Sequence, residues 1–443
     1  MIGDRGRTSA SIGRAHRRGG TWHSRRRMIA GAVSAVLAAT GLAACSSASA
    51  GTGPVTLNYY LYPDTSGATQ QAINNCDKAS GGKYKISYQQ LPQSADGQRQ
   101  QLVRRLAARD DTIDIMGLDV TWEAEFATAG WIEPWTGTNK AQAVNGTLVP
   151  ALNTAIWKGK LYAVPANTNT QLLWYRSDLV PKPPATWAEM IADAEQLAKE
   201  GKPHYIEIQG AQYEGATVWF NTMVSSAGGT VLNPDATKIT LDARAVKALT
   251  IMKQLANSTA ADPSMTVQME NQNRLQMEAG NAAFELNYPF VYPGMKADNP
   301  KLFKVFKWAL YPEVTAGVPA KVTIGGIDLA VSSYSQHKDL AFQAALCLRN
   351  RENQLIGANV GGVPPTIASL YNDPKLFANY PFHADILKAL QNASVRPKTP
   401  VYQVVSIDIS HQISPASSIN PTSTLQSMKG SLSNALQSKG LVP

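Results

Sequence analysis

The sequence predicts an α/β protein with two domains, each built on a doubly wound sheet with flanking helices. Three observations lead to this fold class. The chain has 443 residues, which is long enough for two complete hydrophobic cores. Hydrophobic residues make up 44% of the chain and charged residues 16%, which excludes a disordered or coiled-coil protein. Strand-like and helix-like segments alternate, as they do in parallel sheets with helical crossovers.

In the first part of the chain, the expected elements alternate between strand and helix. The strand segments are rich in β-branched and aromatic residues, and the helical segments place apolar residues on one face. We expect strands over 55–62, 84–91 and 113–118 and helices over 67–79, 97–108 and 120–129. Ligands bind beyond the carboxyl ends of the strands in such sheets. Asp64 and Asp119 follow two of these ends, so both are candidate binding residues.

A second unit begins near residue 167. Thr186 and Glu189 have the spacing of a capping box, which predicts a helix over 187–199. The pair Gly325 and Gly326 is expected to interrupt a strand. The other expected elements are strands over 171–175, 282–286 and 321–331, helices over 214–227, 243–256 and 340–353, and a helix that ends over 274–278.

The net charge of +9 is concentrated at the start of the chain. The first 44 residues carry eight arginines and one acid, whereas the following 399 residues carry 33 bases and 31 acids. A nearly neutral body without a basic stripe argues against a protein that binds the phosphate backbone of nucleic acids.

Residues 1–44 resemble the signal peptide of a bacterial lipoprotein. Their arginine-rich start is followed by an apolar run over 28–44, and the sequence LAAC that ends at Cys45 resembles a lipobox. The resemblance implies that Cys45 is acylated and becomes the mature N-terminus, and that 45–54 tethers the protein to the outer face of the cytoplasmic membrane. A membrane-spanning anchor is the alternative, but the apolar run is short for the roughly 17–25 residues of a span. Export by the Sec or the twin-arginine route stays open.

Two cysteines remain if Cys45 carries lipid. Export would place the protein in an oxidising compartment, where an even number of cysteines usually pairs. We therefore predict a disulfide bond between Cys76 and Cys347. Two buried free thiols are the alternative. No spacing of cysteine and histidine indicates a metal site, and we expect no cofactor.

Two longer segments resemble the solute-binding proteins of ABC sugar importers. Residues 162–189 (YAVPANTNTQLLWYRSDLVPKPPATWAE) resemble the stretch where that family crosses between lobes, and residues 276–290 (QMEAGNAAFELNYPF) resemble its helix-glycine-strand-proline element. The resemblance implies a two-lobed periplasmic-binding-protein-like fold with crossing hinge strands. In this arrangement, lobe 1 comprises 55–166 and 318–365, and lobe 2 comprises 167–317 and 366–443.

A closer similarity is to the mycobacterial trehalose-binding lipoproteins within that family, and it rests on 115–131, 168–176, 321–331 and 395–406. It implies that an interlobe cleft captures trehalose or a closely related disaccharide, which an ABC permease and its ATPase import. The sugar contacts implied by matching residues are Asp119, Asn169, Glu270, Gly325, Gly326 and Arg396. Tyr288 stands where these relatives have tryptophan, so the aromatic ring is smaller and the identity of the sugar stays open.

These residue types suit a sugar. Carboxylates accept hydrogen bonds from neighbouring hydroxyls, arginine donates in a fixed fork, and an aromatic ring covers a C–H face. Trp219, five residues after Glu214, is a further candidate to line the cleft. Each contact also has a structural alternative: a helix cap for Asp119, a strand turn for Asn169, a solvated helix position for Glu270, the core for Tyr288 and a surface ion pair for Arg396.

Two other classes of protein remain open. An exported glycoside hydrolase needs two facing carboxylates, which Asp119 and Glu270 could imitate. A tethered envelope scaffold would have no cleft for a small molecule. The chain lacks the Gly-x-Ser-x-Gly, His-Glu-x-x-His and Gly-Lys-Ser/Thr motifs, and we therefore favour a monomeric binding protein without enzymatic activity.

Overall fold

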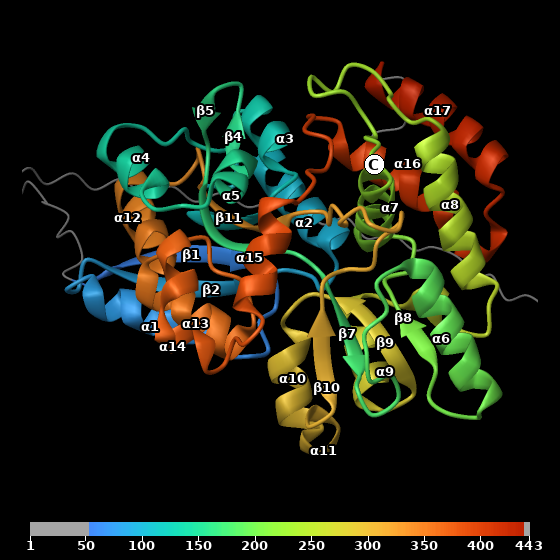
Figure 1. Ribbon diagram of the computed structural model, residues 1–443. Coiled ribbons are helices and arrows are strands. Elements are labelled where there is room, and N and C mark those ends of the chain that lie inside the picture. Colours follow the sequence, from blue (N-terminus) through green and yellow to red (C-terminus); the bar gives the residue numbers. More distant parts are fainter. Residues whose placement is uncertain (1–52, 438–443) are drawn as a thin grey trace, which may run out of the picture. The chain divides into compact units, whose positions relative to one another are not determined.

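Two separate β-sheets organise the protein, and helices cover both of them (Figure 1). The computed structural model describes residues 53–437. The predicted signal peptide over 1–44 and the predicted lipidation site Cys45 lie outside these residues, as does most of the predicted tether. These assignments therefore stay predictions.

The first sheet has five strands in the order β2-β1-β3-β11-β6, and we call this sheet and the helices packed on it lobe 1. Strands β1, β2 and β3 are parallel, whereas β11 runs antiparallel to both β3 and β6. The predicted parallel arrangement of the first three strands is confirmed, and the two later strands make the sheet mixed. The elements are β1 (Val55–Leu61), α1 (Ala68–Ala79), β2 (Tyr84–Gln90), α2 (Ala95–Ala107), β3 (Ile115–Asp119), α3 (Glu123–Thr128), β6 (Val164–Asn169) and β11 (Gly325–Val331).

Local sequence explains these elements. Leu57 on β1 and Ile115 and Leu118 on β3 are fully buried in the core of lobe 1. Ser94 accepts a hydrogen bond from the backbone N–H of Gly97 at 3.2 Å, which caps α2 at its start. The lobe is completed by α4 (Gly137–Val144), α5 (Val149–Thr154), β4 (Ile156–Trp157), β5 (Lys160–Leu161) and α12 (Lys338–Leu348).

The second sheet has four strands in the order β10-β7-β9-β8, and we call it and its helices lobe 2. On β7, Leu173 and Tyr175 belong to one hydrophobic cluster, and Leu172 and Trp174 belong to another, so the sheet is covered on both faces. The strands are β7 (Leu172–Arg176), β8 (Tyr205–Glu207), β9 (Ala282–Asn287) and β10 (Phe306–Ala309). The first cluster lies under α6 (Trp187–Lys199), α7 (Glu214–Ser226), α8 (Ala243–Ala256), α16 (Tyr402–Ile413) and α17 (Pro421–Leu436).

The second cluster of lobe 2 brings together distant parts of the chain. Phe382, just before α15, packs edge-on against Trp174 on β7, with ring centroids 5.2 Å apart. Further short elements complete the chain: α9 (Glu270–Glu278), α10 (Val291–Asp298), α11 (Pro300–Phe303), α13 (Arg351–Gly361), α14 (Pro374–Phe377), α15 (His383–Gln391), and 3-10 helices at Met265–Val267, Ala368–Asn372 and Ala416–Ser418.

Two acids are buried inside lobe 2 on neighbouring strands. Glu207 on β8 and Glu285 on β9 are opposite one another in the register, and neither is exposed. Burial, with a smaller contribution from the nearby charge of Asp262, raises the pKa of Glu207 to about 9. Burial raises the pKa of Glu285 to about 8. Both carboxyls are therefore protonated in the folded protein at neutral pH.

The chain passes from lobe 1 to lobe 2, back to lobe 1 and, after α12, to lobe 2 again. The first two of these passages lie side by side. Strand β6 belongs to the first sheet and β7 to the second, with Thr170 and Gln171 between them. The segment between β10 and β11 leads back from the second sheet to the first, and it ends at Gly325, which pairs with Asn169. The two crossings therefore meet at the edge of the first sheet, as expected for hinge segments.

Two predicted elements need correction. The strand expected over 321–331 begins at Gly325, so the glycine pair starts the strand and does not interrupt it. The helix expected over 340–353 is two helices, α12 and α13. The break occurs because Asn350 leaves the helical conformation and its side chain accepts from Asn353 N at 2.9 Å, which caps a new helix.

The structure joins Cys76 on α1 to Cys347 on α12, with an S–S distance of 2.07 Å and a Cα–Cα distance of 5.7 Å. Both helices pack on lobe 1, so the bond links the start of this lobe to the segment of lobe 1 that follows the strands of lobe 2 in the sequence.

Within residues 53–437, no helix has both the length and the apolar character that crossing a bilayer requires.

Candidate functional site

A cavity of about 830 Å³ is lined by residues from both lobes. Its size is within the roughly 300–1,000 Å³ that is typical of ligand pockets. The carboxyl end of β3, the crossing strands β6 and β11 and the first residues of α7 and α9 all contribute to its wall. Eight predicted binding residues line this cavity: Asp64, Asp119, Asn169, Glu270, Tyr288, Gly325, Gly326 and Arg396.

Arg396 is the charged centre of the site. Its Nη2 lies 3.1 Å from Asp119 Oδ1 at the end of β3, and its Nη1 lies 2.5 Å from Glu214 Oε1 at the start of α7. The guanidinium thus links a carboxylate of lobe 1 to a carboxylate of lobe 2. Burial acts to lower the pKa of Arg396, but its neighbouring acids and tyrosines outweigh burial and raise it, so the group stays charged. The alternative of a surface ion pair for Arg396 is wrong, since the residue is only 5% exposed.

Glu214 is a site residue that the sequence analysis did not select. It is 7% exposed, and besides Arg396 it accepts hydrogen bonds from Tyr402 Oη at 2.5 Å and from Ser406 Oγ. Burial raises its pKa to about 7, although Arg396 opposes this shift. Acids are common in the first turn of a helix because their negative charge interacts favourably with the positive end of the helix dipole. Nothing in the sequence therefore distinguished Glu214 as a binding residue.

Asp119 is the last residue of β3 and Asn169 is the last residue of β6, so both lie at the carboxyl ends of strands of the first sheet. Asp119 Oδ1 accepts from the backbone N–H and the hydroxyl of Thr121 at 3.0 and 2.8 Å. This is a local turn and not a helix cap, because α3 begins four residues later, at Glu123. Asn169 Oδ1 accepts from the N–H of Thr170 at 3.1 Å, which leaves its side-chain amide N–H groups available to the cavity.

Gly326 must be glycine for reasons of backbone packing. Its φ angle is +139°, and a Cβ here would lie 2.5 Å from the carbonyl oxygen of Asn167 and 2.8 Å from Thr168 Cα. Neither backbone atom can move without breaking the pairing of β6 and β11. The bare backbone of this position consequently forms part of the cavity wall.

Three side chains of lobe 2 gather on the other side of the cavity. Glu270 begins α9, Tyr288 follows β9, and Tyr213 precedes α7. Burial raises the pKa of Glu270 above its usual value. Burial and then the charge of Glu270 raise the pKa of Tyr288, so its hydroxyl stays protonated. Burial and then the charge of the neighbouring Glu270 also raise the pKa of Tyr213.

Asp64 lines the cavity, but its carboxylate is committed locally. Oδ1 accepts from the N–H of Ser66 at 2.8 Å and from its hydroxyl at 2.6 Å, and Oδ2 accepts from the N–H of Thr69 at 2.7 Å. Burial acts to raise the pKa of Asp64, but these hydrogen bonds outweigh it and hold the pKa below its usual value. Asp64 therefore shapes the start of α1 as well as the wall of the cavity.

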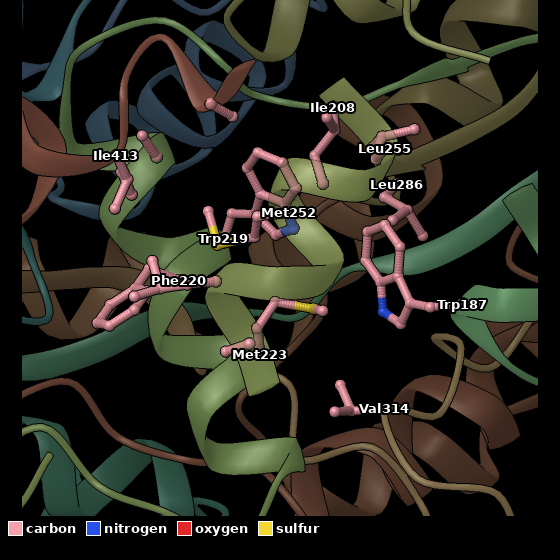
Figure 2. Close-up of a cluster of buried hydrophobic side chains, with 14 of the residues drawn as sticks. Trp187, Ile208, Trp219, Phe220, Met223, Met252, Leu255, Leu286, Val314 and Ile413 are labelled. Carbon is pink, nitrogen blue, oxygen red and sulfur yellow. The ribbon is translucent and has the colours of Figure 1, made fainter. Parts of the chain in front are cut away.

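The prediction that Trp219 lines the cleft is corrected. Trp219 is 1% exposed and stacks on Trp187 within the core of lobe 2, with ring centroids 6.2 Å apart (Figure 2). On α7, Glu214 and Val218 lie four residues apart and both face the cavity. Five residues rotate a side chain by about 140° around a helix, which turns Trp219 away from the side of Glu214.

The side chains that line this cavity are hydrogen-bonding groups of the kind that bind a polar ligand. Within residues 53–437, no cluster of three or more histidine, cysteine, aspartate or glutamate side chains is arranged to hold a metal ion. The cavity presents carboxylates, amides, guanidiniums and tyrosine hydroxyls. Comparison with known proteins agrees with this arrangement.

A profile of the family described as bacterial extracellular solute-binding protein matches residues 62–354. The chain belongs to this family. A probable ABC transporter-binding protein of Deinococcus radiodurans is 30% identical over 347 residues, which cover 74% of this chain and 81% of that protein. The family is one of solute-binding proteins, so it gives no support to the alternative of a glycoside hydrolase.

Solved structures of this family's fold superpose on most of the chain. The maltose-bound MalE3 of T. maritima has a TM-score of 0.79 and 25% identity, covering 85% of this chain and 99% of its own. A solute-binding protein of Thermotoga lettingae, bound to α-D-tagatose, has a TM-score of 0.77 and 22% identity, covering 86% of this chain and all of its own. The predicted two-lobed α/β fold is confirmed.

Proposed function

We propose that this protein captures trehalose or a closely related disaccharide in the cavity between its lobes and delivers it to an ABC permease driven by an ATPase. Lipid on Cys45 would hold it at the outer face of the cytoplasmic membrane. The observation that carries the proposal is the Asp119–Arg396–Glu214 trio, in which one guanidinium joins the two lobes across the cavity. Similarity to the maltose-bound MalE3 and to the D. radiodurans ABC transporter-binding protein supports the choice of ligand class and partner.

The polar atoms of the cavity support a ligand with many hydroxyls. Arg396 Nε is buried without a partner in the described chain, and buried polar atoms normally have one. A sugar hydroxyl can accept a hydrogen bond, so it can satisfy this atom. The ring of Tyr288 offers an apolar face for the sugar C–H groups, which contributes about 1 kcal/mol beyond burial.

In this proposal the protein binds sugar without covalent chemistry. Each lobe contributes hydrogen-bonding groups, and the crossing segments at Thr170 and Gly325 act as hinges when the lobes close. Asp119 Oδ1 lies 3.1 Å from Arg396 Nη2 and accepts from the N–H of Thr121, which fixes the position of the carboxylate for recognition of hydroxyls. The contacts of Asp119, Asn169, Glu270 and Arg396 with the sugar are part of the proposal.

Calorimetry of the purified protein with trehalose, maltose, sucrose and glucose tests this function. We expect saturable binding of trehalose, weaker binding of the other sugars, and no release of glucose from trehalose or a nitrophenyl glycoside. Released glucose would show an enzyme. If none of the sugars bound or raised the melting temperature, the sugar-binding proposal would be wrong.

A further inference from the structure

A second, smaller cavity lies on lobe 1, at the break between α12 and α13. Its volume is about 400 Å³, and no residue lines both this cavity and the sugar cavity. Two arginines and no acid line it. The polar residues of its wall are Gln142, Asn145, Arg349, Asn350, Arg351 and Ser369.

Arg349 is buried at this cavity without a carboxylate. The residue is 5% exposed, and its Nη2 donates to Thr147 Oγ1 at 2.8 Å while its Nη1 donates to the carbonyl of Gln142 at 3.4 Å. Its Nε is buried with no partner in the described chain. Burial, with no acid to oppose it, lowers the pKa of Arg349 to about 10, so the group is still charged at neutral pH. A buried cation without an anion is costly for a folded protein.

The N-terminus of α13 adds to the positive potential. This helix has 11 residues, and the structure gives no acceptor among residues 53–437 to the backbone N–H groups of Arg351 and Glu352. Arg351 is oriented by Ser369 Oγ, to which its Nη1 donates at 2.9 Å, and by Asp373, at 2.5 Å from its Nη2. The arginine side chain and the helix end therefore meet at the wall of one cavity.

We propose that this cavity binds a small oxyanion, such as a phosphate group. Arg349 supplies an uncompensated charge, Arg351 supplies a second guanidinium at the rim, and Ser369 and the start of α13 supply further donors. Arginine side chains and helix N-termini both bind phosphate groups in proteins. The phosphate group can come from solution or from a lipid headgroup at the membrane surface, and both sources present the same chemistry.

Titration with inorganic phosphate, against chloride at equal ionic strength, tests the proposal on the purified protein. We expect saturable binding that raises the melting temperature, and an affinity about tenfold weaker in Arg351→Gln, because a hydrogen bond between charged groups is lost. Arg349→Gln should abolish the rise in melting temperature. Arg104→Gln is the matched control, since it removes the same charge from an exposed position on α2 and should bind phosphate as the wild type does.

A second arm separates the two sources of phosphate. Phosphatidylcholine vesicles with and without phosphatidic acid are sedimented with the protein and with both variants. Binding that depends on Arg351, in solution or on phosphatidic acid vesicles, supports the site and identifies its source. If neither form of phosphate bound, or if Arg351→Gln and Arg104→Gln bound equally, the proposal would be overturned. Arg351 is exposed, so its variant is expected to fold even where Arg349→Gln does not.

Discussion

Replacing Arg396 with methionine removes the guanidinium that joins the two lobes and keeps a side chain of similar length. Glu214 then loses the cation that lies 2.5 Å away, and Asp119 loses one at 3.1 Å. Burial already raises the pKa of Glu214 to about 7 against the opposing effect of Arg396. Without Arg396 this pKa rises further, so Glu214 takes up a proton at neutral pH.

The expected cost follows from the burial of Glu214. Removing one partner of a buried ion pair costs about 3–5 kcal/mol of unfolding free energy. Glu214 can be protonated and keeps hydrogen bonds from Tyr402 and Ser406, so we expect the low end, about 3 kcal/mol. The second change Glu214→Gln replaces the carboxyl, which must otherwise take up a proton, by a neutral amide and should recover most of this loss. Sugar affinity should fall by about ten- to a hundredfold in Arg396→Met and should not recover in the double variant.

Urea unfolding and trehalose calorimetry on the wild type, both single variants and the double variant separate these two effects. The matched control is Arg99→Met, because Arg99 forms a similarly buried ion pair with Glu125 in lobe 1, and neither residue lines the sugar cavity. The control should lose stability and keep its sugar affinity. If the double variant bound trehalose as tightly as the wild type, Arg396 would not contact the ligand. If Arg396→Met unfolded like the wild type, the argument from buried charge would be wrong.

Four further predictions follow from the same contacts. Asp119→Asn should weaken trehalose binding by about tenfold in calorimetry, with little change in unfolding, since the side chain is 21% exposed. Tyr288→Ala should weaken binding by about 1 kcal/mol and Tyr288→Trp should strengthen it, measured in the same way. The folded state keeps the proton of Glu207 up to about pH 9, whereas the unfolded state loses it above the usual 4.5. The contribution of Glu207 to stability should therefore fall across that window by up to about 1.4 kcal/mol per pH unit, and Glu207→Gln should make the fall of melting temperature with pH less steep. Replacing Cys76 and Cys347 by alanine should cost about 2–5 kcal/mol in urea unfolding, and mass spectrometry of non-reduced peptides should find the two joined in the wild type.

Periodicity was sufficient to predict the elements that alternate most regularly. The helices α6 and α8 begin and end where their apolar pattern and capping residues indicate. Asp119 was predicted from its position at a strand end alone, before any resemblance was considered, because that position follows from parallel strand topology. These are consequences of local sequence and of one general rule.

Contacts between distant residues were not predictable in this way. Glu214 and Arg396 are 182 residues apart, and neither the helix that carries Glu214 nor the loop that carries Arg396 indicates its partner. The break between α12 and α13 was missed because the polar residues 349–354 are compatible with one continuous helix, and only the side chain of Asn350 reveals a cap. Trp219 was misplaced for a simpler reason, since helical geometry already puts it on a different side from Glu214.

The pairing of charges distinguishes the two cavities and the ligands proposed for them. In the larger cavity, Arg396 is balanced by Asp119 and Glu214, and Arg274 is balanced by Glu278 and Asp298 at 2.6 and 2.7 Å. Charged side chains there offer directed hydrogen bonds to a neutral sugar without leaving an unpaired cation. At the smaller cavity, Arg349 has no carboxylate partner, so its charge is available to an anion. A nearly neutral protein body can thus hold one site for an uncharged ligand and another for a negative one, because local pairing and not net charge decides which ligand each cavity favours.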